Sequence, residues 1–304
     1  MRLVFAGTPE VALPSLEALL GSSHEVVAVV TRPDAPAGRG RKLTPSPVAQ
    51  RAQELGLEVL KPGKPSQDDF KQRLRELAPD ACPVVAYGAL LPQSVLDIPR
   101  LGWVNLHFSL LPRWRGAAPV QRAIMAGDAE IGTACFRIVR ELDAGDVYRM
   151  AAIPTPDATA GEVLAMLAAT GASQLVEALD AMAAGEQPTP QANVGVTVAP
   201  KVTVEEARLD FTRPARELRN LVMGCSPDPG SWCELDGERF KVYRATVAED
   251  DVALKPGELL LLKNRVLAGT GLGVLELQEV QAAGKRRMNA ADWARGGHSG
   301  AVLR

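Results

Sequence analysis

Short apolar runs alternate with amphipathic stretches through the first half of the chain. The runs are rich in β-branched residues, as in buried parallel strands, and the stretches between them carry apolar residues at helical spacing. This alternation predicts a βαβ arrangement with a parallel-rich sheet. The predicted strands are Leu3–Ala6, Val26–Thr31, Cys82–Tyr87 and Trp103–His107, and the predicted helices are Glu10–Leu20, Val48–Leu55, Asp68–Leu77 and Val120–Ala126.

A long helix rich in alanine and leucine is predicted at Ala160–Ala184, and the pattern changes after it. Proline and glycine punctuate the segment that follows, as in a linker between domains. Beyond it a helix is predicted near Pro214–Met223, and short strands with turn signals begin. Ser231–Val247 is predicted to be a hairpin, because Asp236-Gly237 is typical of a two-residue hairpin turn.

These changes divide the chain of 304 residues into two domains, as the usual domain size suggests. We predict a first domain at residues 1–187, a linker at 188–205 and a smaller β-rich domain at 206–304. The first strand-to-helix turn, Ala6-Gly7-Thr8-Pro9, lacks the glycine pattern that lets a backbone approach a pyrophosphate. We therefore expect a Rossmann-like sheet that binds no nicotinamide dinucleotide.

The composition is that of an ordinary soluble enzyme, with 46% hydrophobic and 23% charged residues. No apolar run approaches the length of a membrane span, about 18 residues. The chain enters a strand at once and shows no secretory signal, so we expect a cytoplasmic protein without membrane association. The four cysteines are widely spaced and three histidines accompany them, so neither a metal site nor a disulfide framework is expected.

The net charge is −2 and the isoelectric point is near 6.0, which argues against a generally basic nucleic-acid binder. Contacts with RNA would have to come from local basic clusters. One cluster is a loop that contains Arg32, Arg39, Arg41 and Lys42, and the other is Lys285-Arg286-Arg287. Such clusters are more often solvated surface than binding sites, so charge alone leaves both interpretations open.

Candidate chemistry gathers at the end of the strand predicted at Trp103–His107. Asn105 and His107 are two residues apart, so they project from the same face of the strand. An amide donor and a titratable imidazole then share one volume at the sheet edge where open parallel sheets bind ligands. Asp143 follows in a Leu-Asp-Ala-Gly turn and can orient the imidazole. Each residue also has a structural interpretation, since aspartate is common in turns.

Five motifs together resemble the folate-dependent formyltransferase family, and within it the members that act on methionyl-tRNA. The most specific is Ser109-Leu-Leu-Pro-Arg-Trp-Arg-Gly-Ala-Ala-Pro119, which follows His107. The others are Val4-Phe-Ala-Gly-Thr-Pro9, Pro36-Ala-Gly-Arg-Gly40, Val84-Val-Ala-Tyr-Gly88 and Ala199-Pro-Lys201. The resemblance covers nearly all of the chain. It implies an α/β fold in which a Rossmann-like domain with a parallel-rich sheet precedes a smaller, OB-like β-barrel.

The resemblance implies transfer of a formyl group from 10-formyltetrahydrofolate to the α-amino group of methionine on initiator methionyl-tRNA, for translation initiation. Asn105, His107 and Asp143 stand where the family carries its catalytic residues. Attack of an amine on a formamide carbon needs donors for the oxyanion and a group that moves protons, which an amide and an imidazole supply. No metal is expected.

The same resemblance implies two binding surfaces. A flat apolar slot for the pterin is expected beside the catalytic residues, edged by backbone groups. The folate-binding candidates are Tyr87, Gly88, Leu90, Leu91, Ser109, Leu110, Leu111, Pro112, Arg140, Glu141 and Leu142. The tRNA-binding candidates are Arg39, Arg41, Lys42, Lys201, Lys285, Arg286 and Arg287. The sequence departs from the family at Phe108, where a small residue is usual, and strand alternation favours a ring turned to the other face.

Two alternatives stay open. A small-molecule formyltransferase would act on an amino-sugar nucleotide or on glycinamide ribonucleotide. The basic loop that contains Arg39, Arg41 and Lys42 and the second domain argue against this alternative. A non-enzymatic RNA-binding protein would not need Asn105, His107 and Asp143 together. We expect a monomer, because the chain has no heptad pattern that would indicate an interface.

Overall fold

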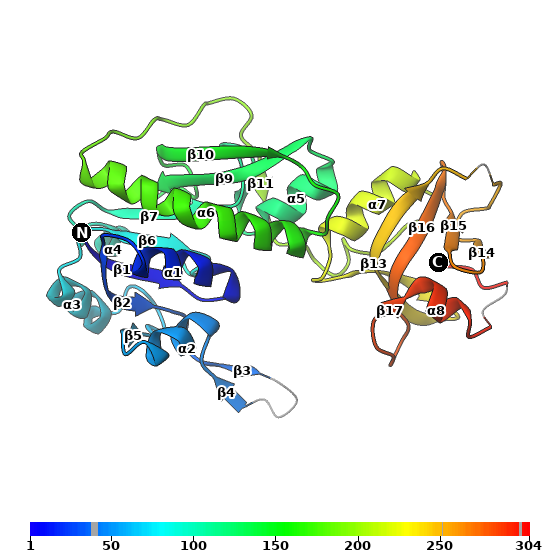
Figure 1. Cartoon of the computed structure of the whole chain (residues 1–304), viewed down its shortest axis with the longest axis horizontal. Coiled ribbons are helices and arrows are strands. Elements are labelled where there is room, and N and C mark those ends of the chain that lie inside the picture. The colour runs from blue at the N-terminus through cyan, green and yellow to red at the C-terminus, as the bar shows by residue number, and fades with distance from the viewer. Residues whose placement is uncertain (38–41, 251, 298–299) are drawn as a thin grey trace. The chain divides into compact units, whose positions relative to one another are not determined.

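A seven-stranded sheet lies at the centre of the first structural unit (Figure 1). The computed structural model describes residues 1–37, 42–250, 252–297 and 300–304. Five strands pair in parallel, β9 pairs antiparallel with β7, and β10 lies beside β9 at the edge. In spatial order the strands are β10 (Val147–Pro154), β9 (Glu130–Arg137), β7 (Trp103–His107), β6 (Cys82–Val85), β1 (Arg2–Gly7), β2 (Glu25–Val30) and β5 (Glu58–Leu60).

The four strands predicted from apolar runs are confirmed, with ends that differ by at most two residues. The sequence pattern did not predict β5, β9 and β10. β5 is three residues long, and β9 contains Gly132 and Ala134, which have low strand propensity. The outer half of β10 is largely exposed, so it lacks the apolar run of a buried strand.

Helices lie between the strands along the chain. The predicted helix Glu10–Leu20 is split, because Pro14 lacks an N–H group and a new helix begins beside it. The helices are the 3-10 helix η1 (Glu10–Ala12), α1 (Leu13–Leu20), α2 (Pro47–Glu54), α3 (Asp68–Leu77), α4 (Gln93–Leu96), α5 (Pro119–Ala126) and α6 (Ala160–Ala183).

The helix α6 has the length and apolarity of a membrane-spanning helix, but half of its most apolar window is buried inside the protein. Leu167, Leu175 and Leu179 are buried. A Cβ atom added at Gly171 would lie 3.0 Å from the side chain of Leu106 in β7, so the helix runs close against the sheet (Figure 1). α6 is therefore a core helix of the first unit.

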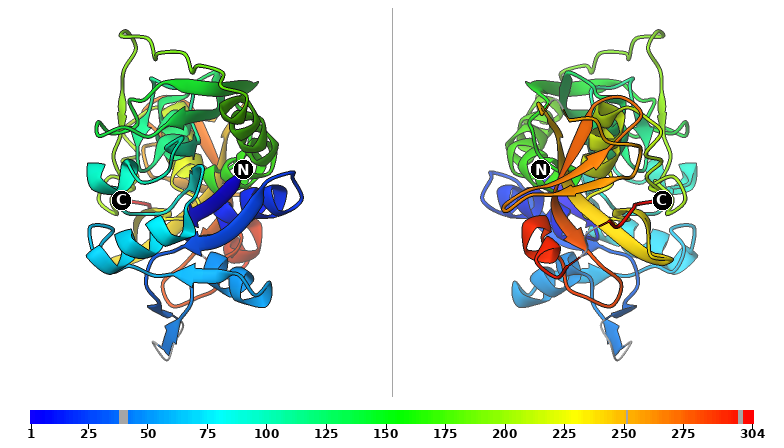
Figure 2. Two further views of the ribbon diagram at one scale, coloured as in Figure 1. Left: turned by 90° about the vertical axis from the view of Figure 1, so that its left-hand side faces the viewer. Right: turned by 90° about the vertical axis from the view of Figure 1, so that its right-hand side faces the viewer.

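Two small ladders lie outside the main sheet. β3 (Ala35–Ala37) and β4 (Lys42–Thr44) form a hairpin that projects from the first unit in Figures 1 and 2. β8 (Arg115–Gly116) pairs with β11 (Val198–Ala199). The second ladder brings the segment after α6 back to the loop that follows β7.

The second unit is a small antiparallel β-barrel, whose strands curve around one core in the right-hand view of Figure 2. Val302 and Leu303 bridge to residues at opposite edges of the sheet, Glu258 and Leu235, which closes the barrel. The hairpin predicted around Asp236-Gly237 is confirmed, and both turn residues have positive φ. The order is β12 (Ser231–Leu235), β13 (Glu238–Ala248), β16 (Val274–Gln281), β15 (Val266–Gly269) and β14 (Leu259–Leu261), with β17 (Met288–Asn289) on β16 and α8 (Ala290–Ala294) after it.

The two units are not contiguous in sequence. The helix α5 belongs to the second unit, where it packs against α7 (Ala215–Gly224) and Met125 contacts the barrel core. The segment at 188–198, predicted as linker, groups with the first unit, and the predicted domain limits themselves stay a prediction. The first unit comprises Met1–Gly116, Ile131–Ile153 and Leu164–Val198, and the second comprises Ala117–Glu130, Pro154–Val163 and Ala199–Arg304.

Candidate active site

The last residues of β7 place an amide and an imidazole at one edge of the sheet. Leu106 faces α6, so Asn105 and His107 turn to the opposite face, as strand alternation requires. His107 is almost fully buried, with 5% of its surface exposed, and its ring meets Phe136 edge to face at 6.2 Å. Asn105 is partly exposed, so its amide can reach a ligand.

The backbone fixes the protonation pattern of His107. Its Nε2 atom lies 2.9 Å from the carbonyl oxygen of Trp114. A carbonyl can only accept, so Nε2 carries the proton and donates it, and the neutral ring keeps its free lone pair on Nδ1. That Nδ1 atom lies 3.8 Å from Oδ2 of Asp143. The ring is therefore oriented to take up a proton on Nδ1 beside a carboxylate.

Two opposing effects act on the His107 imidazole. Burial lowers its pKa below the ordinary value, because the charged ring loses hydration, while the Asp143 carboxylate and the bond to Trp114 raise the pKa. The net direction is downward, so the ring is neutral near pH 7 and can act as a base. Asp143 limits how far the pKa falls.

A tightly held turn presents Asp143. The residue has a left-handed backbone, with φ of 48°, and its Oδ2 atom accepts a hydrogen bond of 2.8 Å from the Gly116 N–H group. A Cβ atom at Gly145 would overlap the carbonyl oxygen of Arg137. The glycine of the Leu-Asp-Ala-Gly motif is thus required because the turn lies directly against β9.

The loop after β7 is folded onto itself. The Ser109 hydroxyl is buried and donates to the Arg113 carbonyl at 2.6 Å, and Arg113 N–H donates to the Leu110 carbonyl at 3.1 Å. Leu111 is buried, whereas Leu110 and Pro112 are partly exposed and can line a ligand slot. Phe108 is buried as well.

The turn after β6 offers backbone groups for a flat ligand. Ala86 and Gly88 both have positive φ, which turns their peptide groups out of the strand pattern. The Thr8 hydroxyl donates to the carbonyl of Tyr87 at 2.8 Å and fixes the turn, while the Tyr87 ring is buried. Leu90 is 80% exposed, so it lies outside the core and its side chain is open to a ligand.

The remaining folate candidates lie beside Asp143 in the sequence and at the surface. Arg140, Glu141 and Leu142 are all exposed. Arg115 Nη1 lies 3.6 Å from a carboxylate oxygen of Glu141, which ties this rim to the loop after β7.

Sequence reasoning missed two residues that hold these loops together. Gln191 bonds to Arg115 and to the backbone of the Asp143 turn, and Thr197 Oγ1 accepts from the Trp114 N–H group at 2.8 Å. Both lie in the segment predicted to be a linker. Its proline-rich composition gave no signal of a role in the site.

The tRNA-binding candidates are distributed over both units. Arg39 and Arg41 lie outside the described residues. Lys42 is exposed on β4 of the first unit, and Lys201, Lys285 and Arg286 are exposed in the second.

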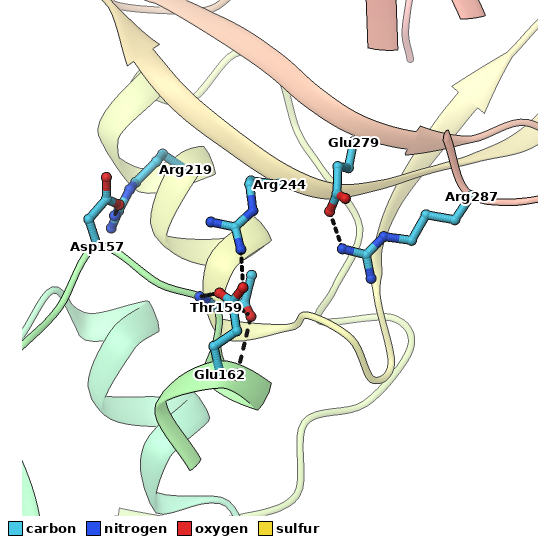
Figure 3. A network of polar contacts seen from close by, with 7 residues as sticks. All are labelled: Asp157, Thr159, Glu162, Arg219, Arg244, Glu279 and Arg287. Carbon is cyan, nitrogen blue, oxygen red and sulfur yellow. Dashed lines mark hydrogen bonds and ion pairs between the residues drawn. The ribbon is translucent and has the colours of Figure 1, made fainter. Parts of the chain in front are cut away.

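Arg287 is held in a network of ion pairs within the second unit (Figure 3). Its guanidinium pairs with Glu279 and stacks on the Tyr243 ring, 4.6 Å from the ring centre. Arg244 pairs in the same way with Glu162, and Arg219 with Asp157. Each of these three arginines of the second unit thus has an acidic partner.

Within the described part of the chain, no group of three or more histidine, cysteine, aspartate or glutamate side chains is placed to hold a metal ion. The four cysteines are free and buried.

Family models cover most of the chain. One described as "Formyl transferase" matches residues 1–179, and one described as "Formyl transferase, C-terminal domain" matches residues 201–298. A methionyl-tRNA formyltransferase of Streptomyces coelicolor is 57% identical over 299 residues, covering 97% of this chain and 96% of the relative. A methionyl-tRNA formyltransferase of Thermobifida fusca is 57% identical over 302 residues, covering 99% and 97%.

A solved structure shares the fold at low identity. WlaRD, a sugar 3N-formyl transferase crystallised in the presence of dTDP and 5-N-formyl-THF, aligns with a TM-score of 0.71 and 15% identity. The alignment covers 94% of this chain and 99% of that one. At this identity the likeness concerns the fold.

Replacing Asp143 with asparagine is expected to lower the pKa of His107 further, because the carboxylate raises it and the amide carries no charge. The measurement is an NMR titration of the imidazole C–H signals, with the His107 signal assigned by its loss in His107→Gln. A higher pKa in the Asp143→Asn protein would contradict the geometry described above.

Replacing Gly145 with alanine should destabilise the protein by about 1–3 kcal/mol, the usual cost of overpacking, because the added Cβ atom overlaps the Arg137 carbonyl. Thermal unfolding measures the effect. Gly63→Ala is the matched control: an atom added there would lie 3.5 Å from the flexible Gln67 side chain, an ordinary contact. Equal melting temperatures for the two variants would refute the argument.

Proposed function

The chain belongs to the formyl transferase family, and we propose that it transfers the formyl group of 10-formyltetrahydrofolate to the α-amino group of methionine on initiator tRNA. The proposed chemistry rests on one observation: Asn105 and His107 lie at the carboxyl end of β7, and the Asp143 carboxylate lies 3.8 Å from the His107 ring. The near-full-length match with relatives named for this reaction supports the tRNA substrate over a small molecule. We further propose that the reaction serves translation initiation in the cytoplasm and that the enzyme acts as a monomer.

His107 moves the protons in this scheme. The amine of methionine attacks the formyl carbon, and its proton passes to Nδ1 of His107, the nitrogen that holds the lone pair. The imidazolium that forms lies 3.8 Å from the Asp143 carboxylate, which stabilises its charge. The same proton then passes to N10 of the folate as the carbon–nitrogen bond breaks, so the enzyme ends in its starting state.

Asn105 holds the negative charge that develops on the formyl oxygen. Addition of the amine produces a tetrahedral oxyanion, and the amide N–H group donates a hydrogen bond to it. A positioned donor of this kind typically contributes about 3 kcal/mol to the transition state. Asn105 is suited to the task because it projects from the same strand face as His107, two residues away.

The folate co-substrate is proposed to bind along the loops that carry the candidates. The turned-out peptide groups at Ala86–Gly88 supply hydrogen bonds for the pterin ring, and Leu90 and Leu110 supply apolar edges. Arg140, Glu141 and Leu142 form the opposite rim. No metal or nicotinamide cofactor enters this scheme.

The tRNA is far larger than this site, so we propose that basic residues elsewhere bind its phosphates. Lys42 contributes from the β3–β4 hairpin, and Arg39 and Arg41 are proposed from the sequence alone. Lys201 and Lys285–Arg287 contribute from the second unit. Arg287 is paired with Glu279 in Figure 3, so it can bind a tRNA phosphate only when that ion pair breaks.

Transfer of labelled formyl from the folate to charged initiator tRNA tests the proposal. His107→Ala and Asn105→Ala should each lower kcat by roughly a hundredfold or more, the scale of a lost proton carrier or oxyanion donor. Near-wild-type turnover in either variant would remove the mechanism. Label on an amino-sugar nucleotide or on glycinamide ribonucleotide, with none on tRNA, would favour the small-molecule alternative.

Replacing Glu279 with glutamine is expected to tighten tRNA binding, since it frees Arg287 and removes a negative charge from the surface. Arg287→Ala should weaken binding and reduce the salt slope by about one unit, the effect of one lost phosphate contact. Binding is measured across a salt series. Glu58→Gln, which breaks the exposed pair with Arg73 in the first unit, is the control. Salt curves for the Glu279 and Arg287 variants that superimpose on the wild type would exclude Arg287 from the tRNA surface.

A further inference from the structure

Gln191 uses its whole hydrogen-bonding capacity inside the candidate site. Its Oε1 atom accepts from Nε and Nη2 of Arg115, at 3.1 and 2.7 Å. Its Nε2 atom donates to the carbonyl oxygens of Asp143 and Gly145, each at 2.8 Å. A side-chain amide has two donor hydrogens and two acceptor lone pairs, and all four are engaged.

The two segments that Gln191 joins are distant in sequence and both touch the catalytic candidates. Arg115 follows Trp114, whose carbonyl orients the His107 ring, and precedes Gly116, whose N–H group binds Asp143. The other segment is the Asp143 turn itself. The amide therefore lies behind both partners of the pair formed by His107 and Asp143.

We propose that Gln191 is a positioning residue for the His107–Asp143 pair, an inference that rests on the proposed function. It hydrogen-bonds to neither the His107 ring nor the Asp143 carboxylate. Its two donors hold the backbone of the Asp143 turn, which has a positive φ, at the distance that keeps Oδ2 3.8 Å from Nδ1. Its acceptor holds the Arg115 side chain, which is 13% exposed and also lies 3.6 Å from the Glu141 carboxylate.

The electrostatic role of Asp143 makes this positioning measurable. The carboxylate raises the pKa of His107 against burial, and a charge acts less strongly when it moves away. Loosening the turn should therefore move the acid limb of the pH–rate profile to lower pH, the direction expected when Asp143 loses its charge. A residue with a merely structural role would change stability without moving this limb.

Two substitutions separate the halves of the contact. Gln191→Ala removes all four hydrogen bonds. Gln191→Glu keeps an acceptor for Arg115 but replaces the donor by a second oxygen, which faces the carbonyls of Asp143 and Gly145 and repels them. Gln187→Ala is the matched control, because Gln187 is exposed and bonds to Gly185 in its own turn.

Both Gln191 variants should lower kcat about tenfold or more, because small displacements of reacting groups are costly, with KM for folate and tRNA little changed. The acid limb should shift to lower pH in Gln191→Ala, and Gln187→Ala should match the wild type. The carboxylate added in Gln191→Glu raises the pKa of His107 and opposes this shift, so that variant is judged by kcat and by hydrogen exchange. Backbone amides of the Asp143–Gly145 turn should exchange hydrogen faster by mass spectrometry. If Gln191→Ala does not fold, Gln191→Met carries the test of the acid limb, because methionine is uncharged and of similar length.

Turnover within twofold of the wild type in the Gln191 variants would overturn the inference, as would lower turnover of Gln191→Ala with an unmoved acid limb. Wild-type behaviour of Gln191→Glu alone would show that the two hydrogen bonds from Gln191 do not hold the Asp143 turn in place. A wild-type enzyme that fails to formylate charged initiator tRNA would instead remove the proposed function, and the exchange experiment would still report whether Gln191 holds the turn.

Discussion

Burial of the His107 imidazole is the constraint on which the rest of the site depends. A ring removed from water has a lowered pKa and cannot reorient to find partners, so its surroundings have to fix both its proton and its direction. The Trp114 carbonyl fixes the position of the ring proton, and the Asp143 carboxylate helps to fix the direction of the ring. The loop after β7 and the Asp143 turn bring these two groups to one ring.

Unfavourable backbone conformations surround the ring. Five non-glycine residues in the described chain have positive φ, and three of them, Ala86, Trp114 and Asp143, belong to the loops of the candidate site. Such conformations cost on the order of 1–3 kcal/mol each and persist where other contacts hold them. Thr8 holds the first loop, Thr197 the second, and Gly116 with Gln191 the third.

The sequence predicted the parts of this arrangement that depend on local pattern. The apolar run at Trp103–His107 defined β7, and alternation placed Asn105 and His107 on one face. The pattern could not predict Gln191, because an isolated glutamine among prolines has no periodicity and its partners lie up to 76 residues away. It also could not assign α5 to the second unit, because amphipathicity predicts a buried face and not what covers it.

The helix α5 packs against an element that comes much later in the chain, and this has a consequence for synthesis of the protein. Val120, Ala123 and Ile124 are buried in the finished protein, yet α7, against which α5 packs, lies about ninety residues further along. Domains generally fold during synthesis from the amino terminus, so this apolar face stays uncovered while β9, β10 and α6 are made. The nascent chain thus carries this apolar face without α7 until Ala215–Gly224 has been made, and we expect the helix to be open to aggregation and to chaperones during that interval.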